Sequence, residues 1–260
     1  QPEPGAARRQ ARRFPSRFRP GAHARGRYTT GVVEEPESKP SRRIAIEASA
    51  LCTPRPSGVA RYTSRLIRTL LELRARGEGE HDYRVCYRLS RWKLRKHRLG
   101  LADLPRFWHQ EPLFTPLRRP RLVHGTDVRV PNWRGVKKVA TLHDLFSLIS
   151  QHWAPAEFRR RKIRDYRRMA KRCERIITVS ESTRRDFLSH IDYPEERVTV
   201  VHEGVSARFR EREPREIKAV KTRQGLDRPY LLFVGGADRR KNLLGMMRAV
   251  AGSALAEDYQ

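Results

Sequence analysis

Arg43-Ile-Ala-Ile-Glu-Ala48 is a short apolar run that predicts a buried strand, and a helical pattern follows it from Gly58 to Arg74. In the second segment apolar residues recur every three or four positions, so one face of the helix would be buried. Arg61, Arg65 and Arg68 fall on the opposite face. A strand that leads into an amphipathic helix is typical of the βαβ unit of a parallel sheet, so this stretch predicts an α/β fold.

The alternation of strands and helices continues along the chain. Further apolar runs predict strands over Tyr83–Leu89, Leu122–Gly125, Lys138–Leu142, Arg175–Val179 and Arg197–Val201. A second helix is predicted over Ala156–Arg172, where Phe158, Tyr166 and Met169 would be buried and most other side chains are Arg or Lys. A third helix is expected to begin near Ser180, whose hydroxyl can cap it. Together these elements predict a Rossmann-like parallel sheet.

The charge of the chain is strongly positive. The 57 Lys and Arg residues against 29 Asp and Glu give +28, which is typical of proteins that meet nucleic acid or an anionic membrane surface. Residues 1–40 are rich in Arg, Pro and Gly and have too little apolar surface to offset the entropy of ordering, so we expect a disordered basic tail. An RNA-binding arm and a solvated or wrongly translated leader are alternatives for this segment. Residues 1–27 carry +7 of the total, so the remaining +21 lies in residues 28–260 and the folded part is itself basic.

The cysteines and the hydropathy bear on the compartment. Cys52, Cys86 and Cys173 are odd in number and lack Cys-x-x-Cys spacing, which argues against a disulfide framework and against a zinc site. A reducing, cytoplasmic compartment is therefore expected. The sequence has no apolar run of about 18 residues and no signal-peptide core, so any membrane contact is expected to be peripheral, at the inner face.

Tyr230-Leu-Leu-Phe-Val-Gly-Gly-Ala-Asp-Arg-Arg-Lys-Asn-Leu-Leu244 predicts a buried strand, a glycine turn and a basic helix start. The apolar run ends at Gly235, and Arg239, Arg240 and Lys241 follow it, so the turn favours an anion such as phosphate. A structural turn whose charges only solvate the helix start is the alternative. The 31 residues from 230 to 260 amount to one βαβ unit, so we expect a truncated second domain and a chain that is a fragment.

Six segments, taken in order, carry a resemblance to a known family. They are Ser57-Gly-Val-Ala-Arg-Tyr62, Val123-His-Gly-Thr126, Ala140-Thr-Leu-His-Asp-Leu145, Ile177-Thr-Val-Ser-Glu-Ser182, Val200-Val-His-Glu-Gly-Val205 and Phe233-Val-Gly-Gly-Ala-Asp-Arg-Arg-Lys-Asn242. Across residues 42–250 the series resembles the retaining glycosyltransferases of family 4, which have the GT-B architecture of two Rossmann-like domains facing a cleft. The resemblance implies an acceptor-side Rossmann-like domain over residues 41–207, a linker over 208–228 and the truncated start of a nucleotide-sugar-binding domain over 229–260.

The resemblance also implies roles for individual residues. His143 matches the active-site histidine that contacts the donor sugar, although a lone histidine can also be a core or capping group. Gly58 would let the donor phosphates or the transferred sugar approach the backbone, or would only form a tight strand-to-helix turn. Lys241 matches the lysine that binds the donor diphosphate, with Arg240 as the next candidate and Gly235 in the turn before them.

Two departures from the family pattern concern the second domain. The family often has Arg directly after the first glycine of the turn, where this chain has Gly236, so Arg239 or Arg240 would have to replace that contact. The paired glutamates that grip the donor sugar and the ribose have no place in this chain. No Asp-x-Asp motif occurs, so we expect no metal, and no cofactor other than the nucleotide diphosphate sugar as donor substrate.

The reaction implied is transfer of a hexose, with mannose as one candidate, from a nucleotide diphosphate sugar to an acceptor hydroxyl with retention. The expected partners are the sugar donor and a glycan or lipid-linked acceptor, together with an anionic membrane at the basic helix over residues 156–172. No nucleic acid is expected, because the sequence has no aromatic-rich RNA-binding strand, helix-turn-helix signature or zinc finger. The alternatives are an inactive acceptor-domain fragment and a basic protein that binds nucleic acid or a membrane surface.

Overall fold

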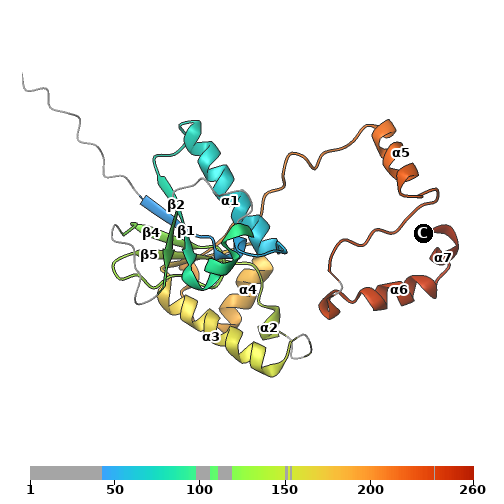
Figure 1. The fold of residues 1–260 in the computed structure, drawn as a ribbon. Helices are drawn as coiled ribbons and strands as arrows, with labels where there is room; N and C mark the ends of the chain where they lie inside the picture. The colour runs from blue at the N-terminus through green and yellow to red at the C-terminus, as the bar shows by residue number, and fades with distance from the viewer. Residues whose placement is uncertain (1–42, 98–105, 111–118, 150–151, 153, 237) are drawn as a thin grey trace, which may run out of the picture. The chain divides into compact units, whose positions relative to one another are not determined.

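The fold is taken from a computed structural model that describes residues 43–97, 106–110, 119–149, 152, 154–236 and 238–260. The predicted tail, residues 1–40, lies outside these ranges. The described residues form seven parallel strands, flanked by helices (Figure 1). The strands are β1 (Arg43–Glu47), β2 (Asp82–Arg88), β3 (Arg106–His109), β4 (Leu122–Gly125), β5 (Lys137–Leu142), β6 (Arg175–Thr178) and β7 (Val198–Val200).

The helices are mostly short, apart from two long ones beside the sheet. The α-helices are α1 (Gly58–Ala75), α2 (Phe146–Ile149), α3 (Ala156–Arg172), α4 (Glu181–His190), α5 (Pro214–Arg223), α6 (Leu243–Ala251) and α7 (Leu255–Asp258). The 3-10 helices are η1 (Ser49–Leu51), η2 (Leu89–His97), η3 (Glu195–Arg197) and η4 (Arg239–Lys241). No helix among the described residues is both long enough and apolar enough to cross a membrane.

The sheet has the strand order β3-β2-β1-β4-β5-β6-β7, so the direction of progression reverses between β1 and β4. This is a doubly wound arrangement, in which ligands bind outside the carboxyl ends of the strands at the reversal point. The predicted α/β fold with a Rossmann-like parallel sheet is confirmed. Six of the strands were predicted to within two residues at each end, and β3 was missed because Arg106–His109 has only two apolar residues.

The core consists of two layers, one on each face of the sheet. Alternate residues of a strand point to opposite faces, so Ile46 packs toward α1 with Ala60 and Ile67. On the other face, Ala45 belongs to the layer that includes Met169 of α3, together with Phe187 of α4. Figure 1 shows α1 on one side of the sheet and α3 and α4 on the other.

Capping explains where two of the helices begin. The side-chain oxygen of Ser57 accepts a hydrogen bond from the backbone N–H of Ala60 at 3.3 Å, and α1 starts at the next residue, Gly58. Ser180 accepts in the same way from the N–H of Thr183 at 3.1 Å, which starts α4 as predicted.

Gly125, the last residue of β4, marks a close approach within the chain. A Cβ there would lie 2.5 Å from Cγ2 of Val130 and 3.2 Å from the carbonyl oxygen of Asp127. A glycine therefore lets the loop after β4 fold back over the end of its own strand, beside the reversal point of the sheet.

The strand predicted over Tyr230–Val234 is wrong. These residues form no strand and belong to no sheet, and the backbone N–H of Leu231 bonds instead to the carbonyl of Gln260 at 3.0 Å. A strand needs a neighbouring strand to satisfy its backbone and cover its apolar side chains, whereas Leu232 and Val234 are 75% and 83% exposed. The segment predicted as a linker, residues 208–228, contains α5, whose first turn has a capping box between Glu213 and Glu216.

Candidate active site

The candidate site lies at the carboxyl ends of the strands next to the reversal point. Glu47 is the last residue of β1, Thr126 directly follows β4, and His143 directly follows β5. Because all strands are parallel, their carboxyl ends meet at the same edge of the sheet. The sheet therefore brings these three residues, which are far apart in the sequence, into one region.

The ring of His143 is held on three sides. Its Nδ1 lies 3.0 Å from Oε1 of Glu203, and its Nε2 lies 3.0 Å from the carbonyl oxygen of Thr126. Both partners are acceptors, so both bonds are made when each ring nitrogen carries a hydrogen. The Tyr62 ring of α1 meets the imidazole edge-on, with 4.8 Å between ring centroids. Thr183 of α4 donates to the backbone oxygen of His143 at 3.2 Å, which anchors the main chain.

A hydroxyl of β5 connects Tyr62 to a second histidine. The Tyr62 hydroxyl lies 3.1 Å from Oγ1 of Thr141, and the same oxygen lies 2.8 Å from Nε2 of His124. Burial and the neighbouring His143 lower the pKa of His124 to about 4, so this ring is neutral at physiological pH. His124 thus supports Tyr62 through Thr141, and Tyr62 in turn orients His143.

A second chain of hydroxyls ties α1 to β1 and β4. The Thr63 hydroxyl donates to Oγ1 of Thr126 at 2.9 Å, and the Thr126 hydroxyl donates to the backbone oxygen of Glu47 at 2.9 Å. Thr63 and Thr126 are both fully buried. Since the carbonyl of Thr126 also accepts from His143, one threonine joins His143 to the end of β1.

Gly58 is the first residue of α1, one turn before Tyr62. A Cβ at this position would meet nothing within 4 Å, so no described neighbour requires a glycine here. The residue is exposed at a helix N-terminus, where backbone N–H groups are available to an anion.

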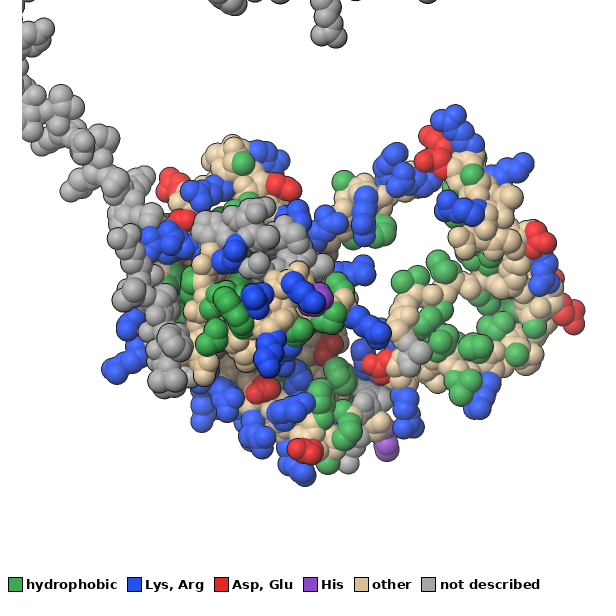
Figure 2. Space-filling model, viewed as in Figure 1, with side chains coloured by type: hydrophobic (Ala, Val, Ile, Leu, Met, Phe, Trp, Pro, Cys, Tyr) green, Lys and Arg blue, Asp and Glu red, His purple; other side chains and the backbone are tan. Residues whose placement is uncertain are grey.

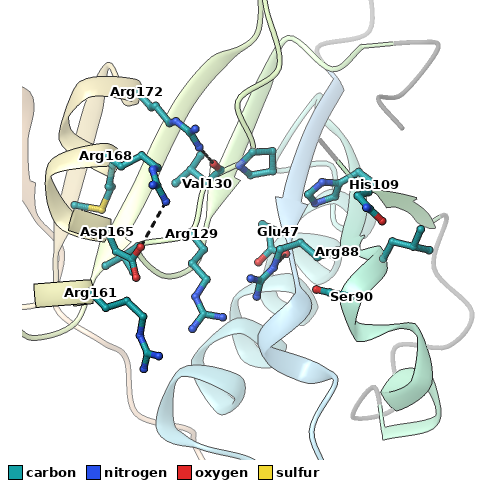
Figure 3. Close-up of a pocket in the computed structure, with 15 residues that line it drawn as sticks. Glu47, Arg88, Ser90, His109, Arg129, Val130, Arg161, Asp165, Arg168 and Arg172 are labelled. Carbon is teal, nitrogen blue, oxygen red and sulfur yellow. Dashed lines mark hydrogen bonds and ion pairs between the residues drawn. The ribbon is translucent and has the colours of Figure 1, made fainter. Parts of the chain in front are cut away.

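A pocket of about 710 Å³ opens beside this edge of the sheet (Figure 3). Its wall contains the arginines Arg88, Arg129, Arg161, Arg168 and Arg172, the carboxylates Glu47 and Asp165, and His109 at the end of β3. Figure 3 shows Glu47, Arg88 and His109 on one side of the pocket and the α3 arginines on the other, with Arg129 between them.

Glu47 is a buried carboxylate with few partners. It is 1% exposed, Nε of Arg88 lies 3.6 Å from its Oε1, and both the hydroxyl and the backbone N–H of Ser49 bond to that oxygen. Burial raises the pKa of Glu47 to about 7, against the opposing effects of Arg88 and Ser49. The group therefore changes charge near neutral pH.

A family model for Glycosyltransferase Family 4 matches residues 56–209, more than half of the chain and all of the region that surrounds His143. The chain belongs to glycosyltransferase family 4. The match begins just before Gly58 and ends after Glu203, so it includes both chains of hydroxyls described above.

The individual proteins that match this family 4 chain share little sequence identity with it. O-antigen chain mannosyltransferase B of Escherichia coli is 25% identical over 129 residues, which are 49% of this chain and 34% of that protein. The crystal structure of Anabaena Alr3699/HepE in complex with UDP and glucose matches with a TM-score of 0.54 and 13% identity, covering 85% of this chain and 60% of that one. The complex with UDP-glucose matches with a TM-score of 0.51 and 15% identity, over 84% and 59%.

These structural likenesses support the GT-B class of fold. The family 4 chain spans about a third of the length of the curated relative and about 60% of the chains in the solved structures.

The three site residues predicted in the C-terminal segment lie on or beside η4. Gly235 is exposed, and a Cβ there would come within 3.0 Å of the Phe233 ring. Asp238 caps η4 by accepting from the N–H of Arg240 at 3.0 Å, and Lys241 is exposed at the end of this short helix. Among the described residues, no hydrogen bond or ion pair links Gly235, Arg240 or Lys241 to His143 or Gly58.

Sequence reasoning on the family 4 chain missed several residues of this region. Glu203 lies in a quoted motif but was given no role, and the pocket residues Glu47, Arg88 and His109 were not singled out. Each of these last three is the final residue of a strand. The predicted ends of β1 and β2 could have indicated Glu47 and Arg88, whereas His109 depended on the missed strand β3.

The charge of Glu47 gives a testable pH dependence. Its folded-state pKa lies above the ordinary value of 4.5, so the native state binds the proton more tightly and stability falls as pH rises from 4.5 to about 7. Glu47→Gln removes this titration. Between pH 4.5 and about 7 the parent should therefore lose about 3 kcal/mol of free energy of unfolding relative to the variant. Urea unfolding at a series of pH values measures the difference. Parallel pH profiles for the two proteins would contradict the assignment.

Proposed function

We propose that this chain is part of a glycosyltransferase that moves a hexose from a nucleotide diphosphate sugar to an acceptor hydroxyl with retention at the anomeric carbon. The observation that carries the proposal is His143, held by Glu203, Thr126 and Tyr62 at the reversal point of a family 4 domain. A side chain held in one orientation at a ligand crevice can contact and position a bound sugar near its reacting carbon.

The donor is proposed from the names of similar proteins. The matched Anabaena HepE structures are complexes with UDP, with UDP and glucose, and with UDP-glucose. The matched Escherichia coli protein is a mannosyltransferase, which makes mannose one candidate for the transferred sugar. Gly58 would let the donor approach the start of α1, where no side chain would intervene.

The donor diphosphate would be bound without a metal. The chain has no Asp-x-Asp motif, while η4 offers Arg240 and Lys241 as cations and exposed Gly235 leaves the backbone accessible. A cation there would offset the charge that develops on the leaving diphosphate as the glycosidic bond breaks. No other cofactor is part of the proposal.

Turnover of a panel of donors tests the proposal directly. The full-length protein is incubated with a glycan or lipid-linked acceptor and with nucleoside diphosphate sugars that carry mannose, glucose or galactose, and both release of the nucleoside diphosphate and formation of the glycosylated acceptor are followed. One donor should be turned over, and NMR of the product should show the anomeric configuration of that donor. Failure to bind or turn over any member of a broad panel would sink the transferase proposal, and an inverted product would overturn retention.

A second proposal concerns the outer face of α3. Arg160, Arg164 and Arg167 are exposed there, and Figure 2 shows Lys and Arg side chains gathered over the part of the domain where Figure 1 places α3. We propose that this face contacts an anionic membrane, because each cation near such a surface contributes about 1 kcal/mol. Flotation with phosphatidylglycerol vesicles tests it, and complete recovery of the protein in the unbound fraction would rule it out.

A further inference from the structure

The pocket beside Glu47 carries more positive charge than its own carboxylates can balance. Five arginines line it, against the two carboxylates Glu47 and Asp165. Asp165 lies 3.7 Å from Arg168, and Glu47 lies 3.6 Å from Arg88. Among the described residues, no carboxylate pairs with Arg129 or Arg161, so the pocket is short of negative charge.

The arginines of α3 reach the pocket from one face of the helix. Arg161, Asp165, Arg168 and Arg172 are spaced by four, three and four residues, which places them in one row along the helix. Arg172 is fixed by a hydrogen bond from Nη1 to the carbonyl of Val130 at 3.4 Å. The guanidinium groups of Arg161 and Arg168 thus face the pocket on a rigid element, and such planar forks match the oxygen pairs of a phosphate.

His109 provides an independent sign of a ligand. The residue is 3% exposed and lines the pocket, and neither of its ring nitrogens has a hydrogen-bond partner among the described residues. Burial and Arg88 lower the pKa of His109 to about 4, so the ring is neutral and offers one donor and one acceptor. The Trp133 ring packs edge-on against it at 5.2 Å between centroids and holds it in place. A buried polar ring without partners is costly unless a ligand or water completes its bonds.

The pocket also adjoins the candidate reaction centre. Glu47 lines the pocket with its side chain, and its backbone oxygen accepts from Thr126, whose carbonyl contacts His143. A smaller pocket of about 250 Å³ shares Arg88 and Arg129 and extends to Ser57 at the start of α1. Neither His143 nor Glu203 lines the larger pocket, so it is separate from the immediate surroundings of that histidine.

From these observations we infer that the pocket is the acceptor subsite and that the acceptor carries a phosphate or diphosphate group, bound by Arg129, Arg161 and Arg168. The sugar next to that group would complete the hydrogen bonds of His109, while its free hydroxyl extends toward His143. The inference rests on the proposed transferase function. Arg129 and Arg161 have no carboxylate partner among the described residues, so an anionic acceptor would gain charge-assisted contacts there that a neutral glycan would not.

Binding of small probes to the whole chain tests the inference. Calorimetric titrations with inorganic pyrophosphate, glucose 1-phosphate and glucose are compared for the parent and two triple variants. The pocket variant is Arg129→Gln, Arg161→Gln, Arg168→Gln, and the control is Arg65→Gln, Arg134→Gln, Arg185→Gln, which lie outside both the pocket and the outer face of α3. Both remove three charges, all six arginines are exposed, and only the first set lines the pocket.

Glucose 1-phosphate and pyrophosphate should bind the parent more tightly than glucose does, and the pocket variant should bind the two anions at least about tenfold more weakly. The control should lose no more than about twofold in affinity, which is the share expected from net charge alone. Equal losses in the two variants would show general attraction of anions and would overturn the inference. Unchanged affinity in the pocket variant would overturn it too.

Two further measurements are needed. The first distinguishes a lipid-linked phosphate from a soluble one, and the second distinguishes failure of this inference from failure of the proposed transferase function. Phosphatidylcholine vesicles with and without a polyprenyl diphosphate show whether a lipid-linked group or only a soluble sugar phosphate is retained, and either result supports the shared chemistry. Donor turnover by the pocket variant is measured without acceptor. If turnover persists while anion affinity falls tenfold, both proposals are supported. If neither parent nor variant turns over a donor even when an acceptor is supplied, the transferase function and the acceptor role of the pocket both fail, and a tenfold loss of anion affinity would then show an anion site alone.

Discussion

Replacing His143 with alanine should lower the kcat of sugar transfer by about 10²-fold, which is the order of loss expected when a group that positions the substrate is removed or displaced. His143 directly follows β5, and its ring is oriented by Glu203, by the carbonyl of Thr126 and by Tyr62. Alanine removes the ring and leaves Glu203 and the carbonyl of Thr126 without their partner. Steady-state kinetics with the preferred donor measures the change.

His190 provides a matched control for this substitution. It is exposed at the end of α4, and within the described part of the chain its Nδ1 contacts Asp186 and Ser189 of the same helix and no other residue. His190→Ala should therefore leave kcat within about twofold, since surface substitutions away from a site usually cost little. A fully active His143→Ala protein with an unchanged circular dichroism spectrum would mean that His143 has only a structural role.

Trp133→Ala should reduce the free energy of unfolding by about 3–5 kcal/mol, the usual cost of truncating a large buried aromatic side chain. Trp133 is 1% exposed and lies in the loop between β4 and β5. Its ring packs against Phe107 at 5.6 Å and against His109 at 5.2 Å between centroids. Alanine would leave a cavity behind β3 that the sheet cannot close without moving that edge strand.

Urea unfolding followed by circular dichroism measures this loss, with Trp92→Ala as the matched control. Trp92 is 45% exposed and contacts Trp108 and Arg95, so its removal should cost about 1 kcal/mol. Equal losses for the two variants would show that Trp133 is not a main support of the core. Trp133→Phe should fall between the parent and Trp133→Ala, because most of the buried area is kept.

How far the sequence predicts this molecule depends on whether the deciding contacts are local. The helix at Gly58 was predicted from the spacing of its own apolar residues, and the start of α4 was predicted from the cap Ser180, which acts within three residues. His143 was predicted as a site residue because the motif around it, Ala140–Leu145, resembles that of the family. In contrast, the run Tyr230–Val234 has the composition of a strand but no neighbouring strand to pair with, and periodicity does not reveal that.

The pocket lay beyond prediction because its residues meet only through the topology. Glu47, Arg88 and His109 come from three different strands, and the α3 arginines join them from a segment more than fifty residues away from His109. The strand order decides which strand ends are neighbours, and alternation of strands and helices does not specify that order. Among 57 cationic residues, nothing in the sequence distinguishes the arginines of the pocket from those in solvent.

The rotation of α3 about its own axis decides which of its arginines line the pocket and which face solvent. One side of this helix places Tyr166 and Met169 in the core, a second side presents Arg161 and Arg168 to the pocket, and a third exposes Arg160 and Arg167. Successive residues are about 100° apart around a helix axis. Insertion of a single residue before Arg160 would therefore rotate all later side chains by about 100°, so that residues of one side would occupy the position of another. The net charge would be unchanged while the core, the pocket and the outer face were all exchanged. In this protein the function of an arginine is therefore encoded by its phase on the helix, and the number of arginines carries little information.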